Sequence, residues 1–103
     1  GEERINKNHR QRQMWIIDSP VYLCFDMDFF DPSCAPGVCT PTFGGATARE
    51  GLQLLAGLQG LKLVAVDVNT VSPPHDVGGM TAFLAATVMI QCLALLCDKP
   101  TDF

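Results

Sequence analysis

Two short runs of large apolar residues have the character of buried β-strands. They occupy residues 21–25 and 61–68, and the first shows no alternation of apolar and polar side chains. Such runs are typical of parallel strands whose two faces are both covered by other elements. The pattern therefore predicts an α/β fold in which both strands belong to one parallel sheet.

A helix is predicted between the two strands, over about residues 47–58. Thr47 can cap its first turn, and Glu50, three residues later, completes a capping box. Strand–helix–strand order predicts a parallel pair joined by a right-handed connection. Two parallel strands cannot cover themselves, so most of the sheet is expected to come from residues outside this sequence or from other chains.

A second helix is predicted to begin near Gly79 and to include residues 80–97, which carry no charge. Its length just reaches that of a membrane-spanning helix. Small and polar residues nevertheless recur at helical spacing, namely Thr81, Ala82, Ala85, Ala86, Thr87 and Gln91. Basic flanks are also missing, because Asp76 precedes the helix and Asp98 and Lys99 follow it. We therefore expect the helix to pack on the sheet and not to enter a membrane.

Two carboxylates, Asp26 and Asp28, follow the first strand directly. Because strand side chains repeat every second residue, both side chains are expected to point to the same side of the sheet. Ligands of open parallel sheets gather beyond the carboxyl ends of the strands, and divalent cations such as Mn²⁺ prefer carboxylate oxygens. The motif predicts a metal site; a turn cap or an ion pair with a basic residue is the alternative.

A long loop rich in proline and glycine, residues 31–45, separates these carboxylates from the first helix. Loops of this length are usually functional or disordered, and this one lacks the charge that is typical of disorder. From residue 21 to residue 96 the chain resembles the ureohydrolases, the superfamily of arginases and agmatinases. Three ordered blocks carry the resemblance: Phe25-Asp26-Met27-Asp28 with Asp31-Pro32; Ala35-Pro36-Gly37-Val38-Cys39-Thr40-Pro41 with Gly44-Gly45 and Arg49-Glu50; and Asp67-Val68-Asn69-Thr70-Val71-Ser72-Pro73-Pro74. The third block is more similar to agmatinases and guanidino-acid hydrolases than to arginases.

The resemblance implies that the chain is the C-terminal part of a three-layer α/β fold with a parallel sheet, in the order strand, loop, helix, strand, loop, helix. It implies a complete enzyme that holds two Mn²⁺ ions, or another divalent metal such as Ni²⁺, and hydrolyses a guanidinium C–N bond to release urea, with a metal-bound hydroxide as nucleophile. Asp26 and Asp28 would be metal ligands, one of them bridging both ions. The resemblance also implies a small guanidino substrate and a homo-oligomer, a trimer or hexamer, for the complete protein.

The chain departs from the family in its metal ligands. The upstream glycine-rich segment with a ligand histidine and the Asp-Ala-His-x-Asp motif are both missing from the sequence. We therefore expect the chain to supply about two of the roughly six ligands of a two-metal centre and to be inactive alone, and we identify no catalytic residue in it. A non-catalytic, truncated homologue that serves as an oligomerisation or regulatory module is the alternative.

Thr70 and His75 are the candidate substrate contacts. Thr70 stands where agmatinases and arginases usually have a glutamate that grips the guanidinium, and its hydroxyl cannot form the bidentate, charge-assisted pair that a guanidinium favours. The substrate therefore remains open among agmatine, guanidino acids and guanidine. His75 follows the second strand, where it can line the substrate pocket, pack in the loop or, less expectedly, shuttle a proton.

Composition narrows the remaining possibilities. The net charge of −4 argues against nucleic-acid binding. The five cysteines form no Cys-x-x-Cys pair and no zinc-finger spacing with histidine, and Cys24, Cys92 and Cys97 are expected to be small buried hydrophobes. Without a signal peptide, the protein is expected to be intracellular, in the cytoplasm or in mitochondria. We predict a polar segment unlike the family at residues 1–18, a partial ureohydrolase domain at 19–98 and a tail at 99–103.

Overall fold

The computed structural model describes residues 19–97. Its elements, in chain order, are strand β1 (Pro20–Asp26), the 3₁₀ turn η1 (Met27–Phe29), helix α2 (Ala48–Ala56), strand β2 (Lys62–Asn69), the 3₁₀ turn η2 (Pro73–His75) and helix α3 (Met80–Leu96). The strands pair in parallel, as the strand–helix–strand order predicts. The predicted segments 1–18 and 99–103 lie outside the described residues.

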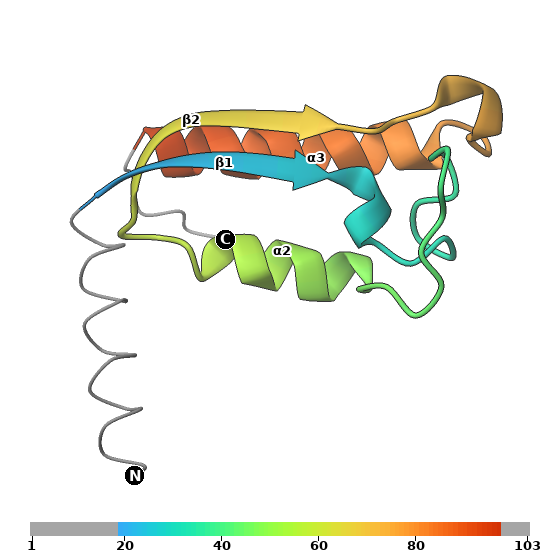
Figure 1. The fold of residues 1–103 in the computed structure, drawn as a ribbon, viewed down its shortest axis with the longest axis horizontal. Coiled ribbons are helices and arrows are strands. Elements are labelled where there is room, and N and C mark those ends of the chain that lie inside the picture. The colour runs from blue at the N-terminus through green and yellow to red at the C-terminus, as the bar shows by residue number, and fades with distance from the viewer. Residues whose placement is uncertain (1–18, 98–103) are drawn as a thin grey trace, which may run out of the picture.

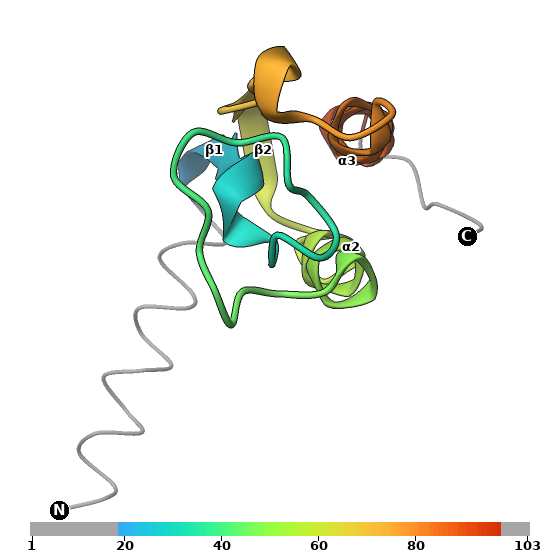
Figure 2. The same cartoon turned by 90° about the vertical axis from the view of Figure 1, so that its right-hand side faces the viewer.

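Both helices lie on the same side of the two-stranded sheet (Figure 1; Figure 2). The Gln91 side chain of α3 donates a hydrogen bond to the Leu52 carbonyl of α2, with 2.9 Å between nitrogen and oxygen, and so ties the helices together. The core lies between the sheet, the helices and the loop that follows β1. Its buried apolar residues are Phe25, Met27, Phe30, Ala35, Val38, Leu55, Ala85, Val88 and Cys92.

The opposite face of the sheet is not covered by any element of residues 19–97 (Figure 2). Tyr22 of β1 is 58% exposed and Val64 of β2 is 59% exposed. Within residues 19–97 this face is open because both helices lie on the other side of the sheet (Figure 1; Figure 2), and its predicted cover is expected from residues outside the described chain. Cys24, which was expected to be buried, is exposed on β1 for the same reason.

Helix α2 is shorter than predicted, but it begins where its capping box places it. The Thr47 hydroxyl accepts a hydrogen bond from the Glu50 amide, and the Glu50 carboxylate accepts one from the Thr47 amide. The helix ends at Ala56, two residues before the predicted end, with Gly57 as C-cap. Gly51 lies in its middle because a Cβ there would come within 2.2 Å of the fully buried Phe30 ring.

Helix α3 has 17 residues and packs through one narrow stripe. Thr81, Ala85, Val88 and Cys92 are buried at spacings of three and four residues. The other small and polar residues predicted to pack, Ala82, Ala86 and Thr87, are exposed. Cys97, also expected to be buried, is exposed at the C-cap because it follows the last helical turn.

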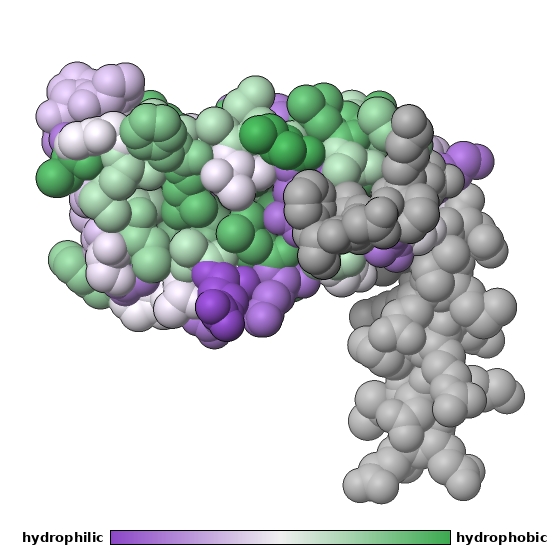
Figure 3. All heavy atoms as spheres, turned by 180° about the vertical axis from the view of Figure 1, so that it is seen from behind, coloured by the Kyte–Doolittle hydropathy of each residue, from purple (hydrophilic) through white to green (hydrophobic). Residues whose placement is uncertain are grey.

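The exposed side of α3 is strongly apolar. Phe83 is 74% exposed, and Met89, Ile90 and Leu93 are exposed as well. Apolar residues cover much of the surface when the molecule is seen from behind (Figure 3). In the described part of the chain, no helix combines the length and the hydropathy that a membrane crossing needs.

Candidate metal and substrate site

The two strands end side by side, and the loops that follow them gather at that end of the sheet (Figure 1). The register pairs Asp26, the last residue of β1, with Asn69, the last residue of β2. Asp28 does not continue the strand, because residues Met27–Phe29 form a 3₁₀ turn. The alternation that was predicted to align the Asp26 and Asp28 side chains is therefore wrong: a 3₁₀ turn, and not a strand, separates them.

The strand ends because its neighbour turns away. Thr70, directly after β2, has a φ of 75° and is the one non-glycine residue of the described chain with positive φ. In place of a ladder bond, the Met27 amide donates to the Thr70 hydroxyl at 2.8 Å. A left-handed conformation costs a β-branched residue on the order of 1–3 kcal/mol, so the surrounding structure must hold Thr70 in place.

The carboxylates are open to an incoming ligand. Asp26 is exposed and Asp28 is half-buried, and no group within residues 19–97 donates a hydrogen bond to either carboxylate. Within the same residues, no three His, Cys, Asp or Glu side chains come together as a metal cluster. Asp26 and Asp28 thus offer hard oxygen donors, which suit Mn²⁺, but they are too few to form a closed metal site.

The two predicted substrate contacts lie after β2. The Thr70 hydroxyl donates its proton to the Asn69 carbonyl at 2.6 Å and accepts from Met27, which leaves one lone pair as an acceptor. His75 is exposed in η2, and its Nδ1 lies 2.6 Å from the Ser72 hydroxyl. That contact occupies Nδ1, so Nε2 is the ring nitrogen available to a ligand.

Two further aspartates organise the loops around this edge. The Asp31 carboxylate accepts hydrogen bonds from the Ser33 amide and hydroxyl and from the Gly44 amide. The bonds from Ser33 are the main reason that the pKa of Asp31 lies below its ordinary value. This role was missed, although the Asp-Pro-Ser sequence is a typical side-chain turn.

The Asp76 side chain caps helix α3, although Asp76 does not occupy the N-cap position of that helix. Its carboxylate accepts hydrogen bonds from the amides of Val77, Thr81 and Ala82. Partial burial raises the pKa of Asp76, but these bonds outweigh it and hold the pKa below the ordinary value of 3.8. The cap was missed because Gly78 and Gly79, with φ of 60° and 78°, fold the chain back and the spacing is not that of a capping box.

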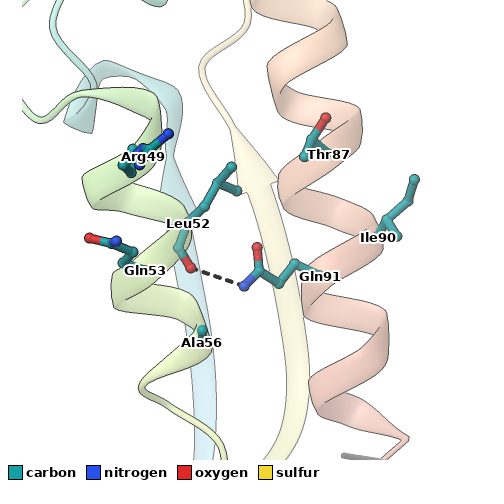
Figure 4. A pocket seen from close by; sticks show the side chains of 7 residues that line it. All are labelled: Arg49, Leu52, Gln53, Ala56, Thr87, Ile90 and Gln91. Atoms are coloured by element: carbon teal, nitrogen blue, oxygen red, sulfur yellow. Dashed lines mark hydrogen bonds between the residues drawn. The ribbon is translucent and has the colours of Figure 1, made fainter. Parts of the chain in front are cut away.

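A separate cavity of about 570 Å³ lies between α2 and α3. It is lined by Arg49, Leu52, Gln53, Ala56, Thr87, Ile90 and Gln91 (Figure 4). None of the candidate metal or substrate residues lines it. The cavity lies where the two helices meet and is not part of the site at the strand ends.

A sequence model of the Arginase family matches residues 2–95. The chain belongs to the arginase family. The match extends into residues 1–18, which sequence analysis set apart from the family, and the proposed boundary at residue 18 remains a prediction. The parallel α/β arrangement is that of the arginase family's solved structures.

Similar proteins carry the names of guanidino hydrolases. This arginase-family chain is 52% identical to a guanidinopropionase of Pseudomonas aeruginosa over 80 residues, which are 78% of this chain and 25% of that protein. It is 45% identical to an agmatinase of Serratia proteamaculans, covering 84% of this chain and 28% of the relative. Proclavaminate amidino hydrolase from Streptomyces clavuligerus superposes with a TM-score of 0.75 at 43% identity, over 77% of this chain and 26% of that one. The chain thus spans about a quarter of the length of the relatives it matches.

Proposed function

We propose that this chain is the metal-ligating part of an amidinohydrolase of the agmatinase or guanidino-acid hydrolase type, which hydrolyses a guanidinium C–N bond and releases urea. One observation carries the proposal. Asp26 ends β1 and Asp28 lies in the turn that follows, at the carboxyl end of a parallel sheet, and neither carboxylate accepts a hydrogen bond from residues 19–97. This is the usual place for ligands in open parallel sheets.

The donor set fits a divalent metal. Two carboxylates leaving an apolar strand repel each other, and a cation would offset that repulsion. We propose two Mn²⁺ ions, with Ni²⁺ as an alternative, held by Asp26 and Asp28 together with ligands from residues outside the described chain. When bound, the ions would lower the pKa of water, so that the nucleophile forms near neutral pH.

The substrate would be a small guanidino compound. The names of the relatives favour a guanidino acid or agmatine, and guanidine itself is a third candidate. The free lone pair of Thr70 can accept one N–H of a guanidinium, and His75 Nε2 can line the pocket or exchange a proton. One neutral acceptor binds a guanidinium more weakly than a carboxylate does, so most of the substrate affinity must come from other residues.

The complete protein is proposed to be a homo-oligomer, a trimer or hexamer, in the cytoplasm or in mitochondria. A human relative that is 43% identical over 75% of this chain is named as a mitochondrial guanidino acid hydrolase. The uncovered sheet face and the apolar surface of α3 also favour a second function, a truncated homologue that binds other subunits without catalysis. We also propose that the partial ureohydrolase domain occupies residues 19–98.

Manganese binding tests the proposal. We expect the chain to bind Mn²⁺ weakly, and Asp28→Asn to reduce the affinity by at least the roughly 10–100-fold that is typical of losing even an outer-sphere partner. Asp67→Asn is the matched control, because it removes a carboxylate from the neighbouring strand that already accepts a hydrogen bond from Asn69. Calorimetry measures the affinity. Equal affinity of wild type and Asp28→Asn would exclude this carboxylate as a ligand.

Urea release and Mn²⁺ binding together separate the two candidate functions. Agmatine, 4-guanidinobutyrate, 3-guanidinopropionate and guanidine are assayed with Mn²⁺. We expect no turnover by the chain alone, since it supplies only two candidate ligands. Turnover would mean that several copies assemble a complete site between them, whereas absence of Mn²⁺ binding would favour the non-catalytic module.

A further inference from the structure

A hydrogen bond between distant parts of the chain lies at the candidate metal site. The Met27 amide donates a hydrogen bond to the Thr70 hydroxyl at 2.8 Å, between residues 43 positions apart in the sequence. Met27 is the one residue between Asp26 and Asp28. The tie therefore joins the end of β2 to the peptide segment that carries both candidate ligands.

The conformation of Thr70 is unusual for its residue type. A φ of 75° is disfavoured for a β-branched side chain and persists only where neighbouring structure requires it. The hydroxyl donates to the Asn69 carbonyl, just behind it, and accepts from Met27. The bond to the Asn69 carbonyl thus orients the Thr70 hydroxyl, whose oxygen accepts the bond from the Met27 amide.

Several contacts hold the segment between the two carboxylates in place. The Met27 side chain is fully buried in the core, and the Met27 carbonyl accepts a hydrogen bond from the Phe30 amide at 3.3 Å. Asp26 is paired in register with Asn69. The Thr70 hydroxyl is the only side chain among residues 19–97 that bonds to the Met27 backbone.

We propose that Thr70 is a positioning residue that holds Asp26 and Asp28 in the arrangement that binds metal. The inference rests on the proposed metal site, and it gives Thr70 a role that a guanidinium contact does not require. Groups that orient metal ligands typically change metal affinity about 10–100-fold when they are removed. Thr70 differs from such groups in acting through the backbone between two ligands and not on a ligand side chain.

The test measures Mn²⁺ affinity and the protection of one amide in the same ¹⁵N-labelled chain. Mn²⁺ broadens the NMR signals of nearby amides, so its titration reports even weak binding at the strand ends. Thr70→Val removes the hydroxyl at nearly constant shape, and Thr70→Gly removes it while relieving the left-handed backbone. Thr70→Ser keeps the hydroxyl. Thr87→Val is the matched control, since the Thr87 hydroxyl also donates to a backbone carbonyl, that of Phe83, but on α3.

We expect Thr70→Val and Thr70→Gly to weaken Mn²⁺ binding about 10–100-fold and to speed hydrogen exchange of the Met27 amide. Thr70→Ser and Thr87→Val should behave like the wild type in both measurements. A role in folding alone would lower stability without changing the affinity of the folded protein. Wild-type Mn²⁺ affinity in folded Thr70→Val and Thr70→Gly would overturn the inference and leave the metal site standing. Absence of Mn²⁺ broadening near residues 26–28 in the wild type would overturn the metal site itself and this inference with it.

Discussion

At the scale of the residue, the close packing of Phe30 against α2 depends on the absence of a side chain at Gly51. Phe30 is fully buried, and its ring lies against the backbone of α2 at Gly51. Phe30 also packs against Phe25 and Phe29, with ring centroids 5.6 Å apart in both pairs. The Phe30 ring is therefore closely packed on several sides and cannot easily move away from a larger residue at position 51.

Gly51→Ala should destabilise the chain although alanine favours helices. The new Cβ would lie 2.2 Å from Phe30 Cε1, and overpacking of this kind typically costs about 1–3 kcal/mol, more than the roughly 0.5–1 kcal/mol gained in helix propensity. Urea denaturation followed by circular dichroism measures the difference. Gly57→Ala at the C-cap, with an ordinary φ of −70°, is the control. Equal midpoints for wild type and Gly51→Ala would contradict this account of the packing.

At the scale of the element, local signals were predictable and distant ones were not. The start of α2 follows from Thr47 and Glu50, which act within a single turn. The end of β1 depends on Thr70, 43 positions away from its partner Met27, and no local pattern reveals that contact. Asp26 and Asp28 were identified from their residue type, but their mutual arrangement was not. The exposure of Cys24 follows from elements that residues 19–97 do not contain.

The cap of α3 gives the chain a specific dependence on pH. Because the folded pKa of Asp76 is lowered from 3.8, its stabilisation is complete above that value and is lost as the pH falls through the folded pKa. We expect Asp76→Asn to be less stable than wild type at neutral pH and to lose less stability on acidification.

Thermal unfolding at neutral pH and near pH 3 measures this effect. Asp67→Asn removes the same charge without removing a helix cap, and it is therefore the matched control for the loss of one carboxylate. Parallel loss of stability in wild type and Asp76→Asn over this pH range would show that Asp76 does not carry the dependence.

At the scale of the whole molecule, residues 19–97 cover one face of the sheet and leave the other face open. The helices bury Phe25 and Leu55 between themselves and the sheet, while Tyr22 and Val64 remain exposed on the far side of the sheet. The outer side of α3 also exposes apolar residues, among them Phe83 and Leu93. Apolar surfaces of this extent are unusual on a monomer and indicate contact with further protein or a tendency to associate.

The surface of α3 should make the isolated chain self-associate. Phe83→Lys combined with Leu93→Lys places two charges on this surface, and we expect it to lower both the sedimentation coefficient at high concentration and the fluorescence of a hydrophobic dye. Phe43→Lys is the control, since Phe43 is an exposed aromatic residue of the loop before α2. Unchanged association of the double variant would assign self-association to the open sheet face instead.

The parallel pairing of β1 with β2 also has a consequence for the order of folding. Contacts within α2 form between residues three or four positions apart, whereas the first bond between the strand ends must close a loop of about 40 residues. Closing such a loop carries an entropic cost that helix α2 does not share, and non-local pairing of this kind slows folding. We therefore expect Asp26, and the turn that carries Asp28, to reach their place beside the end of β2 only after this loop has closed.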